Sequence, residues 1–231
     1  MVGGALEKAF FEKDLARICQ IFGFKQKKQL PLPKKNQNPM KIILNVQPLL
    51  DLSDDQLMLA FSALNPNLRL EVNRFQKLII DMPTHTNTGN HNSLLNYYLT
   101  GWNMEEESGK TYDSSTGFRL PETKSLLSPD MSWIENSRLE KLEKQDGYFN
   151  IAPDFVGELR SDSDTLNELK EKMEEYIENG VRLGWLIDPK GEKVYIYRLN
   201  KENSVQSFEQ KLSGEDVLPN FEVDLLKIFK K

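Results

Sequence analysis

The sequence predicts an α/β protein, a mixed sheet flanked by helices. The main observation is the order of segments between residues 128 and 198: two short apolar stretches, a helical pattern and two further apolar stretches. This order is most simply strand, strand, helix, strand, strand. A second observation is the composition, 39% hydrophobic and 28% charged, which supplies enough apolar side chains for a buried core.

The first 39 residues differ in composition from the rest of the chain. Apolar residues from Leu6 to Phe22 recur at helical spacing and predict a short amphipathic helix. The segment 25–39 is polar, basic and proline-bearing, which is typical of a linker. We therefore predict an N-terminal extension over residues 1–39 and one domain over 40–231. The alternative is that the extension is a basic arm that contacts nucleic acid.

The next elements follow from periodicity and capping. Serine and glutamine at a capping-box spacing predict a helix over residues 54–64. Two apolar segments joined by Asn-Arg predict a hairpin of strands 68–72 and 77–81. Leucines and a tyrosine at helical spacing predict a helix over 90–102, and a charged segment predicts another over 136–144.

The segment between residues 128 and 198 contains the remaining elements. Its first two strands are expected within 128–134 and 152–161, and its helix runs from about Thr165 to Asn179, where glycine ends it. Two further strands are expected over 183–187 and 194–197.

Charge and cysteine content exclude some classes of protein. A net charge of −5 argues against a coat protein that binds DNA regardless of sequence, but a nuclease with a local basic groove or metal ions remains compatible. Cys19 is the only cysteine and the N-terminus lacks a signal-peptide pattern, so we expect a cytoplasmic protein without disulfides. No apolar run approaches the roughly 20 residues that span a membrane, so no membrane partner is expected.

Two carboxylates stand among apolar residues of the first two strands, Asp130 and Glu158. Buried carboxylates are costly unless they are paired, hydrogen-bonded or bound to a cation. Because a lysine-bearing helix follows, the pattern predicts a site for a divalent metal. Asp154 lies on the same strand face as Glu158 and is either a further ligand or, as we prefer, a strand-start residue that bonds to its own backbone.

The helix carries two lysines beside its apolar stripe, Lys170 and Lys172. They flank the stripe on opposite sides, so periodicity alone does not decide which one reaches the site. Met173 and Tyr176 lie in the stripe and are expected to pack in the core. His91 begins the earlier helix and either faces the site or is an ordinary helix-start residue.

These residues resemble a known family. Pro129-Asp130, followed by Glu158-x-basic on the next strand, is similar to the PD-(D/E)XK nuclease core. The longer runs Ala-Pro-Asp-Phe-Val-x-Glu-Leu-Arg-Ser over 152–161 and Asn-Gly-Val-Arg-Leu-Gly-Trp-Leu-Ile-Asp-Pro over 179–189 are more specific. They resemble the Uma-type restriction-endonuclease family of bacteria, and the likeness extends from about Met40 to the C-terminus.

The resemblance implies a restriction-endonuclease-like fold and Mg²⁺-dependent hydrolysis of phosphodiester bonds in DNA, with Mn²⁺ as a substitute metal. Asp130, Glu158 and the carbonyl of Leu159 would bind the metal, because Mg²⁺ prefers oxygen ligands. Lys172 matches the family's helix lysine, and Glu71 in the first hairpin is a candidate third acid. A homodimer is expected from the resemblance.

One position departs from the motif. Arg160 stands where the motif has lysine, and arginine cannot act as a base near neutral pH. Arg160 would instead bind the scissile phosphate, while Lys172 supplies the ammonium. The departure keeps an alternative open, a catalytically degenerate protein of this fold that binds nucleic acid or a protein partner.

The composition of the extension leads to the first testable prediction. Deleting residues 1–39 should leave cooperative thermal unfolding intact, with a similar melting temperature, because the linker is polar and the helix has no evident partner in the domain. Differential scanning calorimetry of the full and shortened chains would measure this. Loss of the cooperative transition would show that the extension belongs to the core.

Overall fold

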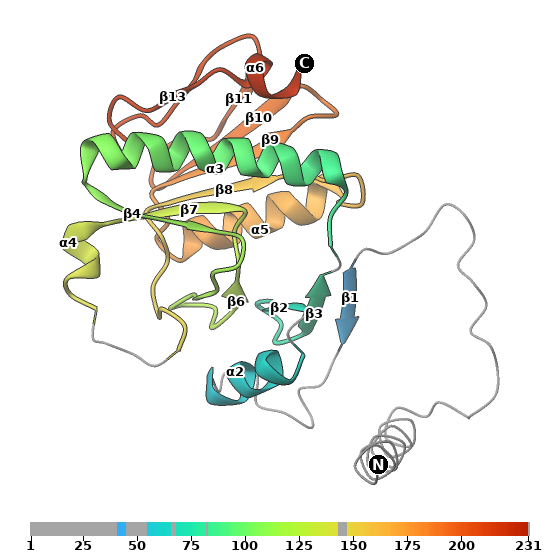
Figure 1. Cartoon of the computed structure of the whole chain (residues 1–231). Coiled ribbons are helices and arrows are strands. Elements are labelled where there is room, and N and C mark those ends of the chain that lie inside the picture. Colours follow the sequence, from blue (N-terminus) through green and yellow to red (C-terminus); the bar gives the residue numbers. More distant parts are fainter. Residues whose placement is uncertain (1–40, 45–54, 66–67, 82, 143–146, 231) are drawn as a thin grey trace, which may run out of the picture. The chain divides into compact units, whose positions relative to one another are not determined.

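The computed structural model describes residues 41–44, 55–65, 68–81, 83–142 and 147–230, all within the unit that runs from Pro39 to Lys231 (Figure 1). The predicted extension over residues 1–39 lies outside these ranges and stays a prediction. No helix in the described ranges is long and apolar enough to cross a membrane.

The centre of the fold is a six-stranded sheet. Its strand order is β11-β10-β9-β8-β7-β4, and only β8 and β9 run parallel. The predicted mixed sheet flanked by helices is therefore confirmed. The strands of this sheet are β4 (Gly109–Asp113), β7 (Met131–Glu135), β8 (Phe155–Leu159), β9 (Leu183–Asp188), β10 (Lys193–Arg198) and β11 (Ser204–Ser207).

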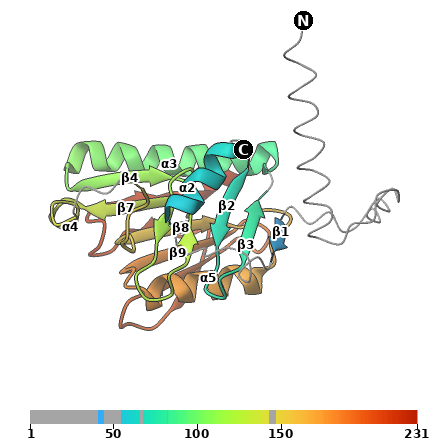
Figure 2. The same cartoon turned by 90° about the horizontal axis from the view of Figure 1, so that it is seen from below.

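Helices cover both faces of this sheet. Two parallel neighbours need a crossover connection, and α5 (Leu166–Glu178) supplies it between β8 and β9. The long helix α3 (Thr86–Glu106) crosses the opposite face, as the two perpendicular views show (Figures 1 and 2). The short helix α4 (Asn136–Leu139) follows β7, and the short helix α6 (Leu225–Phe229) is the last element of the fold.

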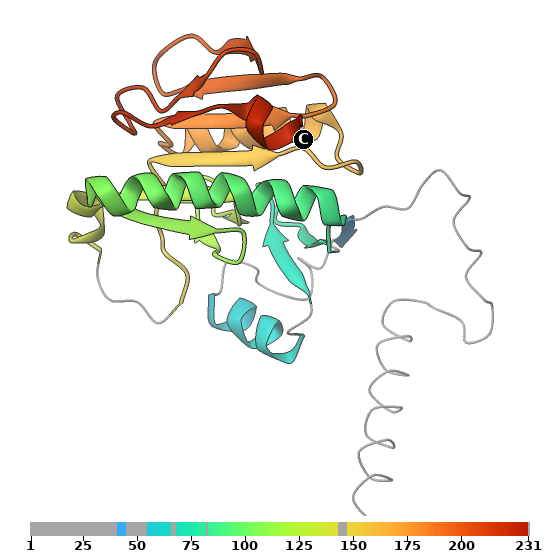
Figure 3. The ribbon, with the colours of Figure 1, turned by 45° about the horizontal axis from the view of Figure 1, so that its top comes forward.

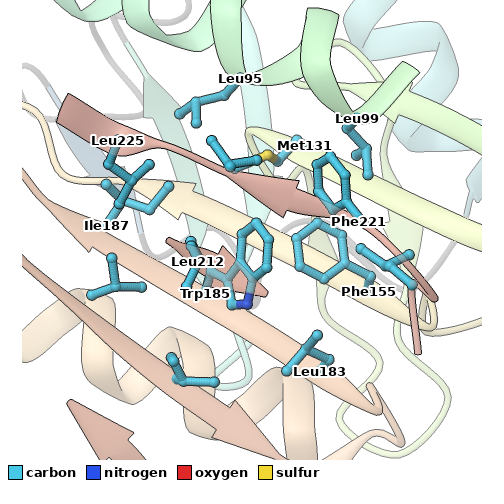
Figure 4. Packing of buried hydrophobic residues seen from close by; sticks show 14 of the residues in the cluster. Leu95, Leu99, Met131, Phe155, Leu183, Trp185, Ile187, Leu212, Phe221 and Leu225 are labelled. Atoms are coloured by element: carbon cyan, nitrogen blue, oxygen red, sulfur yellow. The ribbon is translucent and has the colours of Figure 1, made fainter. Parts of the chain in front are cut away.

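Two hydrophobic clusters fill the space on the two faces. On the α3 face, Leu95 and Leu99 pack with sheet residues such as Met131 and Trp185 and with the C-terminal segment (Figure 4). On the α5 face, apolar residues of α5 pack against strand side chains such as Val156 and Leu186. These side chains alternate along each strand with the ones that face α3. Each strand of the buried centre is therefore apolar on both sides, which explains why the sequence shows continuous apolar runs there.

A second, five-stranded sheet is wholly antiparallel. Its order is β1-β3-β2-β6-β5, and it carries the predicted hairpin as β2 and β3. Figure 3 shows α2 beside it, and Met58 of α2 is buried with Val72 and Leu78 of the hairpin. The elements of this part are β1 (Lys41–Leu44), α2 (Asp55–Leu64), β2 (Arg69–Val72), β3 (Leu78–Asp81), β5 (Phe118–Arg119) and β6 (Leu126–Leu127). A two-stranded ribbon, β12 (Leu212–Ser213) with β13 (Glu222–Val223), precedes α6.

Two helices differ in length from the sequence expectation. The helix expected over 90–102 spans Thr86–Glu106, although threonine, asparagine and glycine in its first turn are weak helix formers. Tertiary packing outweighs propensity here, because one face of this helix is buried against the sheet. The helix expected over 136–144 ends at Leu139, and residues 143–144 of the expected remainder lie outside the described residues.

Candidate active site

Strand geometry places two acids side by side. In the antiparallel pair of β7 and β8, Met131 lies opposite Gly157, so Asp130 and Glu158 lie opposite each other one position further on. Val156 points into the cluster under α5, and strand alternation puts Glu158 on that same face. Glu158 therefore points toward α5, whereas Asp130, just before β7, is contacted by Asn92 of α3.

The carboxylate of Asp130 is held from two sides. Its Oδ2 accepts the backbone N–H of Leu159 at 2.9 Å, and its Oδ1 accepts a hydrogen bond from Asn92 Nδ2 at 2.9 Å. Asn96, one turn further along α3, donates to the backbone carbonyl of Asp130 at 2.9 Å. These bonds fix the side-chain rotamer and leave the acid at the wall of a cavity.

Lys172 joins two acids from different sheets. Its Nζ lies 3.0 Å from Oε1 of Glu158 in β8 and 3.2 Å from Oε1 of Glu71 in β2. Tyr176, one helical turn beyond Lys172, donates its hydroxyl to Oε1 of Glu158 at 2.9 Å. Both acids are almost fully buried, so the lysine is their main source of positive charge.

A second cation lies on the other side of the acids. The guanidinium of Arg69 lies 3.9 Å from Glu71 Oε1 and 4.0 Å from Asp130 Oδ1, and it donates to the carbonyl of Ser128 at 2.5 Å. The N–H of Ser128 in turn donates to Glu71 at 2.9 Å. Among the described residues, the buried Nε of Arg69 has no hydrogen-bond partner.

The charges of this group do not balance when every member is ionised. Three carboxylates, Glu71, Asp130 and Glu158, face two cations, Arg69 and Lys172. We call these five residues the acid cluster. One proton, or one added cation, is needed to offset the excess negative charge.

Of Glu71 and Glu158, only Glu158 has a raised pKa. Burial raises the pKa of Glu158 to about 7, and Asp130 and Glu71 add to the rise while Lys172 opposes it. Burial also acts to raise the pKa of Glu71, but Lys172, Arg69 and the N–H of Ser128 outweigh burial and lower it. The two acids, although they share Lys172, are thus driven apart in pKa, a pattern common at functional sites.

The acid cluster lies in a cavity of about 790 Å³ whose walls come from both sheets, α3 and α5. Asp130, Glu158 and the backbone carbonyls near them offer oxygen donors, which suit a hard cation such as Mg²⁺. Among the described residues, no group of three or more His, Cys, Asp and Glu side chains is arranged to hold an ion. Mg²⁺ commonly takes one or two carboxylates and keeps several waters, so the residues present fit it.

The backbone of Leu159 adds to this donor set. In an antiparallel pair, the N–H and C=O of one residue point toward the same neighbouring strand. Because the N–H of Leu159 bonds to Asp130, its carbonyl also lies on the Asp130 side. The buried Oδ1 of Asn92, beside the same carboxylate, has no hydrogen-bond partner in the described part of the chain and is a further oxygen at this wall.

Comparison with known proteins identifies the family. The family model Uma2, described as "Putative restriction endonuclease", matches residues 55–226, most of the chain. The chain belongs to the Uma2 family. The crystal structure of "a putative nuclease belonging to DUF820" from Anabaena variabilis ATCC 29413 is similar with a TM-score of 0.60 and 18% identity, over 70% of this chain and 89% of that chain. No curated protein matches the chain. The family's description and the fold together support a nuclease function.

Two basic residues considered for the Uma2 site point elsewhere. Arg160 follows β8 directly, and its Nη1 donates to the buried carboxylate of Asp188 at 3.1 Å, outside the described lining of the cavity. Lys170 lies over the ring of Tyr195 at 4.3 Å. A helix turns about 200° between Lys170 and Lys172, so only Lys172 reaches the acids. The structure thus brings together Asp130, Glu158, Glu71 and Lys172, and it separates Arg160 from them.

Asp154 and His91 also lie apart from the acid cluster. Asp154 is buried at the opposite end of β8, where it pairs with Arg138 at 2.9 Å and accepts the N–H of Glu135 at 3.0 Å. It does not line the cavity, in agreement with the preferred non-ligand interpretation, but the backbone that it bonds to is that of Glu135 on β7 and not its own, as had been expected. The ring of His91 packs against Phe229, with 4.4 Å between ring centroids. His91 does not line the cavity, and it lies in the second turn of α3 and not at the helix start that was expected.

Sequence reasoning missed four residues around the acids: Asn92, Asn96, Arg69 and Tyr176. The asparagines carried a signal, since asparagine is a weak helix former and two of them four residues apart share one helix face. Tyr176 was expected to be simple core, yet its hydroxyl bonds to Glu158. Arg69 stands two residues before Glu71, so strand alternation places both on one face.

The raised pKa of Glu158 leads to a prediction on pH. Its folded-state pKa of about 7 exceeds the ordinary 4.5, so the folded protein holds the proton more tightly, and stability is lost as the pH rises from about 4.5 to 7. The loss is on the order of 3 kcal/mol. In EDTA, Glu158→Gln should therefore be relatively more stable at pH 8 than at pH 5, by a large part of that amount, as urea unfolding would measure.

The matched control is Glu171→Gln, an exposed position on the same helix. Its stability should differ from that of the wild type by a constant amount over this pH range. If the curves of Glu158→Gln and the wild type run parallel, the proton is not on Glu158.

Proposed function

We propose that the protein is an Mg²⁺-dependent endonuclease that hydrolyses phosphodiester bonds of DNA, with Mn²⁺ able to replace Mg²⁺. The observation that carries the proposal is the meeting of Asp130, Glu158 and Lys172 in one cavity, at the positions that resemble the PD-(D/E)XK motif. Membership in the Uma2 family supports it.

In this proposal Asp130, Glu158 and the carbonyl of Leu159 hold the cation. When bound, it would lower the pKa of a coordinated water and neutralise charge on the phosphate. Leu159 N–H and Asn92 keep the Asp130 carboxylate in place, and Tyr176 keeps the Glu158 carboxylate in place. Such supporting bonds orient ligands and are needed for affinity as much as the ligands are.

Lys172 is the proposed catalytic cation. Its pKa is raised well above the ordinary value, because Glu158 and Glu71 outweigh the effect of burial, so it carries a full positive charge at neutral pH. A charged ammonium stabilises negative charge that develops on a phosphate oxygen, or orients the attacking water, but it does not remove a proton. Glu71 holds this ammonium at 3.2 Å and is a proposed positioning residue.

In this proposal Arg69, and not Arg160 as the sequence suggested, binds the scissile phosphate. Arg160 is paired with Asp188, whereas Arg69 lines the cavity and retains an unpartnered N–H in the described part of the chain. A guanidinium binds phosphate through several donors in a fixed plane. Hydrolysis then forms a bond from water oxygen to phosphorus and breaks one P–O ester bond. The attacking water releases one proton to solvent, and the leaving oxygen takes one proton from solvent.

A homodimer is part of the proposal, because two such sites would cut both strands of a duplex. Light scattering after size-exclusion chromatography would give the mass of the particle. The rival function is a nucleic-acid- or protein-binding protein without activity, and the two experiments below separate it from the enzyme.

The first experiment measures stabilisation by Mg²⁺. Three carboxylates share two cations, so a divalent ion should relieve their repulsion and raise the melting temperature. The shift should grow from pH 6 to pH 8, because the ion replaces the proton on Glu158. Asp130→Asn should lose the shift, whereas Asp113→Asn, further along the cavity wall, should retain it. Equal shifts in the wild type and Asp130→Asn would remove Asp130 from the metal site.

The second experiment compares the two helix lysines. Lys172→Ala should abolish cleavage of plasmid DNA with Mn²⁺, because an interaction made in the transition state is lost. It should also lower stability above pH 7, since two buried carboxylates lose their counter-ion. Lys170→Ala loses only a contact with Tyr195, so it should cleave at a rate within about twofold of the wild type.

Lys172→Arg keeps the charge and separates catalysis from folding, because arginine does not reproduce the compact ammonium. It should fold and still cleave at least about tenfold more slowly. Normal cleavage by well-folded Lys172→Ala would leave catalysis to another residue.

A further inference from the structure

A second cavity adjoins the active-site cavity. Its lining comes from α3 and β4, which lie side by side in Figure 2. Its volume is about 530 Å³, and Asn96 and Asp113 line both cavities, so the two are neighbours. The remaining residues that line it are Tyr97, Thr100, Gly101, Met104, Thr111, Tyr112 and Thr116.

Large apolar side chains stand exposed along this cavity. Tyr97 is 70% exposed and Met104 is 73% exposed, and they lie seven residues apart on one face of α3. No hydrophobic cluster of the described residues includes either of them. A flat ring and a flexible thioether in this position are suited to contact a flat, partly apolar ligand.

Gly101 independently indicates that this cavity has room for a ligand. It stands in the middle of a 21-residue helix, where glycine is among the least favourable residues. Glycine in a helix commonly allows another part of the chain to approach, yet no described atom lies within 4 Å of the position that a Cβ would take. The protein itself therefore does not use the room that the missing side chain leaves.

The chemistry of the lining favours a base over a phosphate group. Of the described residues that line this second cavity, only Asp113 is charged, and it is negative. The hydroxyls of Thr100 and Thr111, 3.1 Å apart, and the amide of Asn96 offer donors and acceptors among apolar groups. A mostly apolar cavity with a few polar groups is typical of small-ligand sites.

We propose that this cavity binds an unpaired nucleobase next to the scissile phosphate, with the base stacked on Tyr97. The inference rests on the proposed nuclease function and narrows its substrate to DNA with unpaired nucleotides, such as single strands, flaps or mismatches. A base within a duplex is stacked on both faces, whereas an unpaired base has a free face for an aromatic side chain. The net charge of −5 agrees with a substrate held partly by its bases.

The test measures binding of a short single-stranded oligonucleotide that contains 2-aminopurine, whose fluorescence falls on stacking. Ca²⁺ replaces Mg²⁺, and a gel verifies that the strand is intact. Tyr97→Ala should raise the Kd roughly 5- to 150-fold and abolish the fluorescence change. Tyr98→Ala is the matched control, because it removes the neighbouring exposed ring, which touches Tyr97 edge-on at 5.7 Å but does not line the cavity.

A second variant fills the cavity without disturbing the fold. Gly101→Leu should keep or raise the melting temperature, since leucine is a better helix former and meets open space. It should weaken oligonucleotide binding at least about fivefold, while Gly101→Ala, which adds one methyl group, should weaken it less.

For a fully paired duplex, binding by Tyr97→Ala and the wild type should agree within about twofold.

The outcomes separate this inference from the proposed function. If the wild type binds and cuts DNA but Tyr97→Ala and Gly101→Leu match Tyr98→Ala on single strands, the base site is wrong and the nuclease proposal stands. If the wild type neither binds nor cuts any DNA, both fail. Equal loss of binding to duplex and single strands would also overturn the preference for unpaired bases. A concentration-dependent dimer disrupted by Tyr97→Ala, with DNA binding unchanged, would assign the surface to a second copy instead.

Discussion

The ammonium of Lys172 is the point at which the two sheets of this protein meet electrostatically. It contacts Glu158 of the six-stranded sheet and Glu71 of the five-stranded sheet, both nearly excluded from water. Without it, two buried carboxylates would face each other with only Arg69 nearby. Because an unpaired buried charge costs several kcal/mol, the position of α5 relative to both sheets is tied to this lysine.

Polar contacts beyond the acid cluster hold the same junction. Buried Glu175, on α5 one turn beyond Glu171, accepts the hydroxyl of Ser125 just before β6, and the side chain of Asn179 accepts the backbone N–H groups of residues 122 and 123. Ser128, just after β6, bonds to Glu71 through its N–H. The short strands β5 and β6 therefore act as the connection between the sheets, and their register sets where Glu71 stands.

The parts of this fold that were predictable from sequence are those governed by local patterns. The apolar runs around Asp130 and Glu158 predicted two neighbouring strands that each bring one carboxylate to the site, and local end signals placed α2 and α5 within one residue of their ends. Lys172 was chosen through family resemblance rather than periodicity, and the reason appears in the structure: Lys170 is about 200° away around the helix.

What could not be predicted depends on partners distant in sequence. The side chain of Arg160 points away from the acid cluster because it pairs with Asp188, which lies 28 residues later in the chain. The sequence near Arg160 gives no sign of this buried carboxylate. Arg69 reaches Asp130 only because β2 pairs with β6. Asn92 was an unexplained polar residue until the register of β7 brought Asp130 beside it. Long-range pairing, rather than propensity, assembled these contacts.

The separation of 101 residues between Glu71 and Lys172 has a consequence for the order of folding. Contacts between distant residues form late, because closing a long loop costs entropy before the contact is made. Local pairs such as Lys172 with Tyr176, and the β8–α5–β9 unit, can form from a short stretch of chain. The acid cluster, in contrast, requires segments from both ends of the described domain. A partly folded chain therefore lacks the complete set of charges, and the site comes into being only when folding is finished.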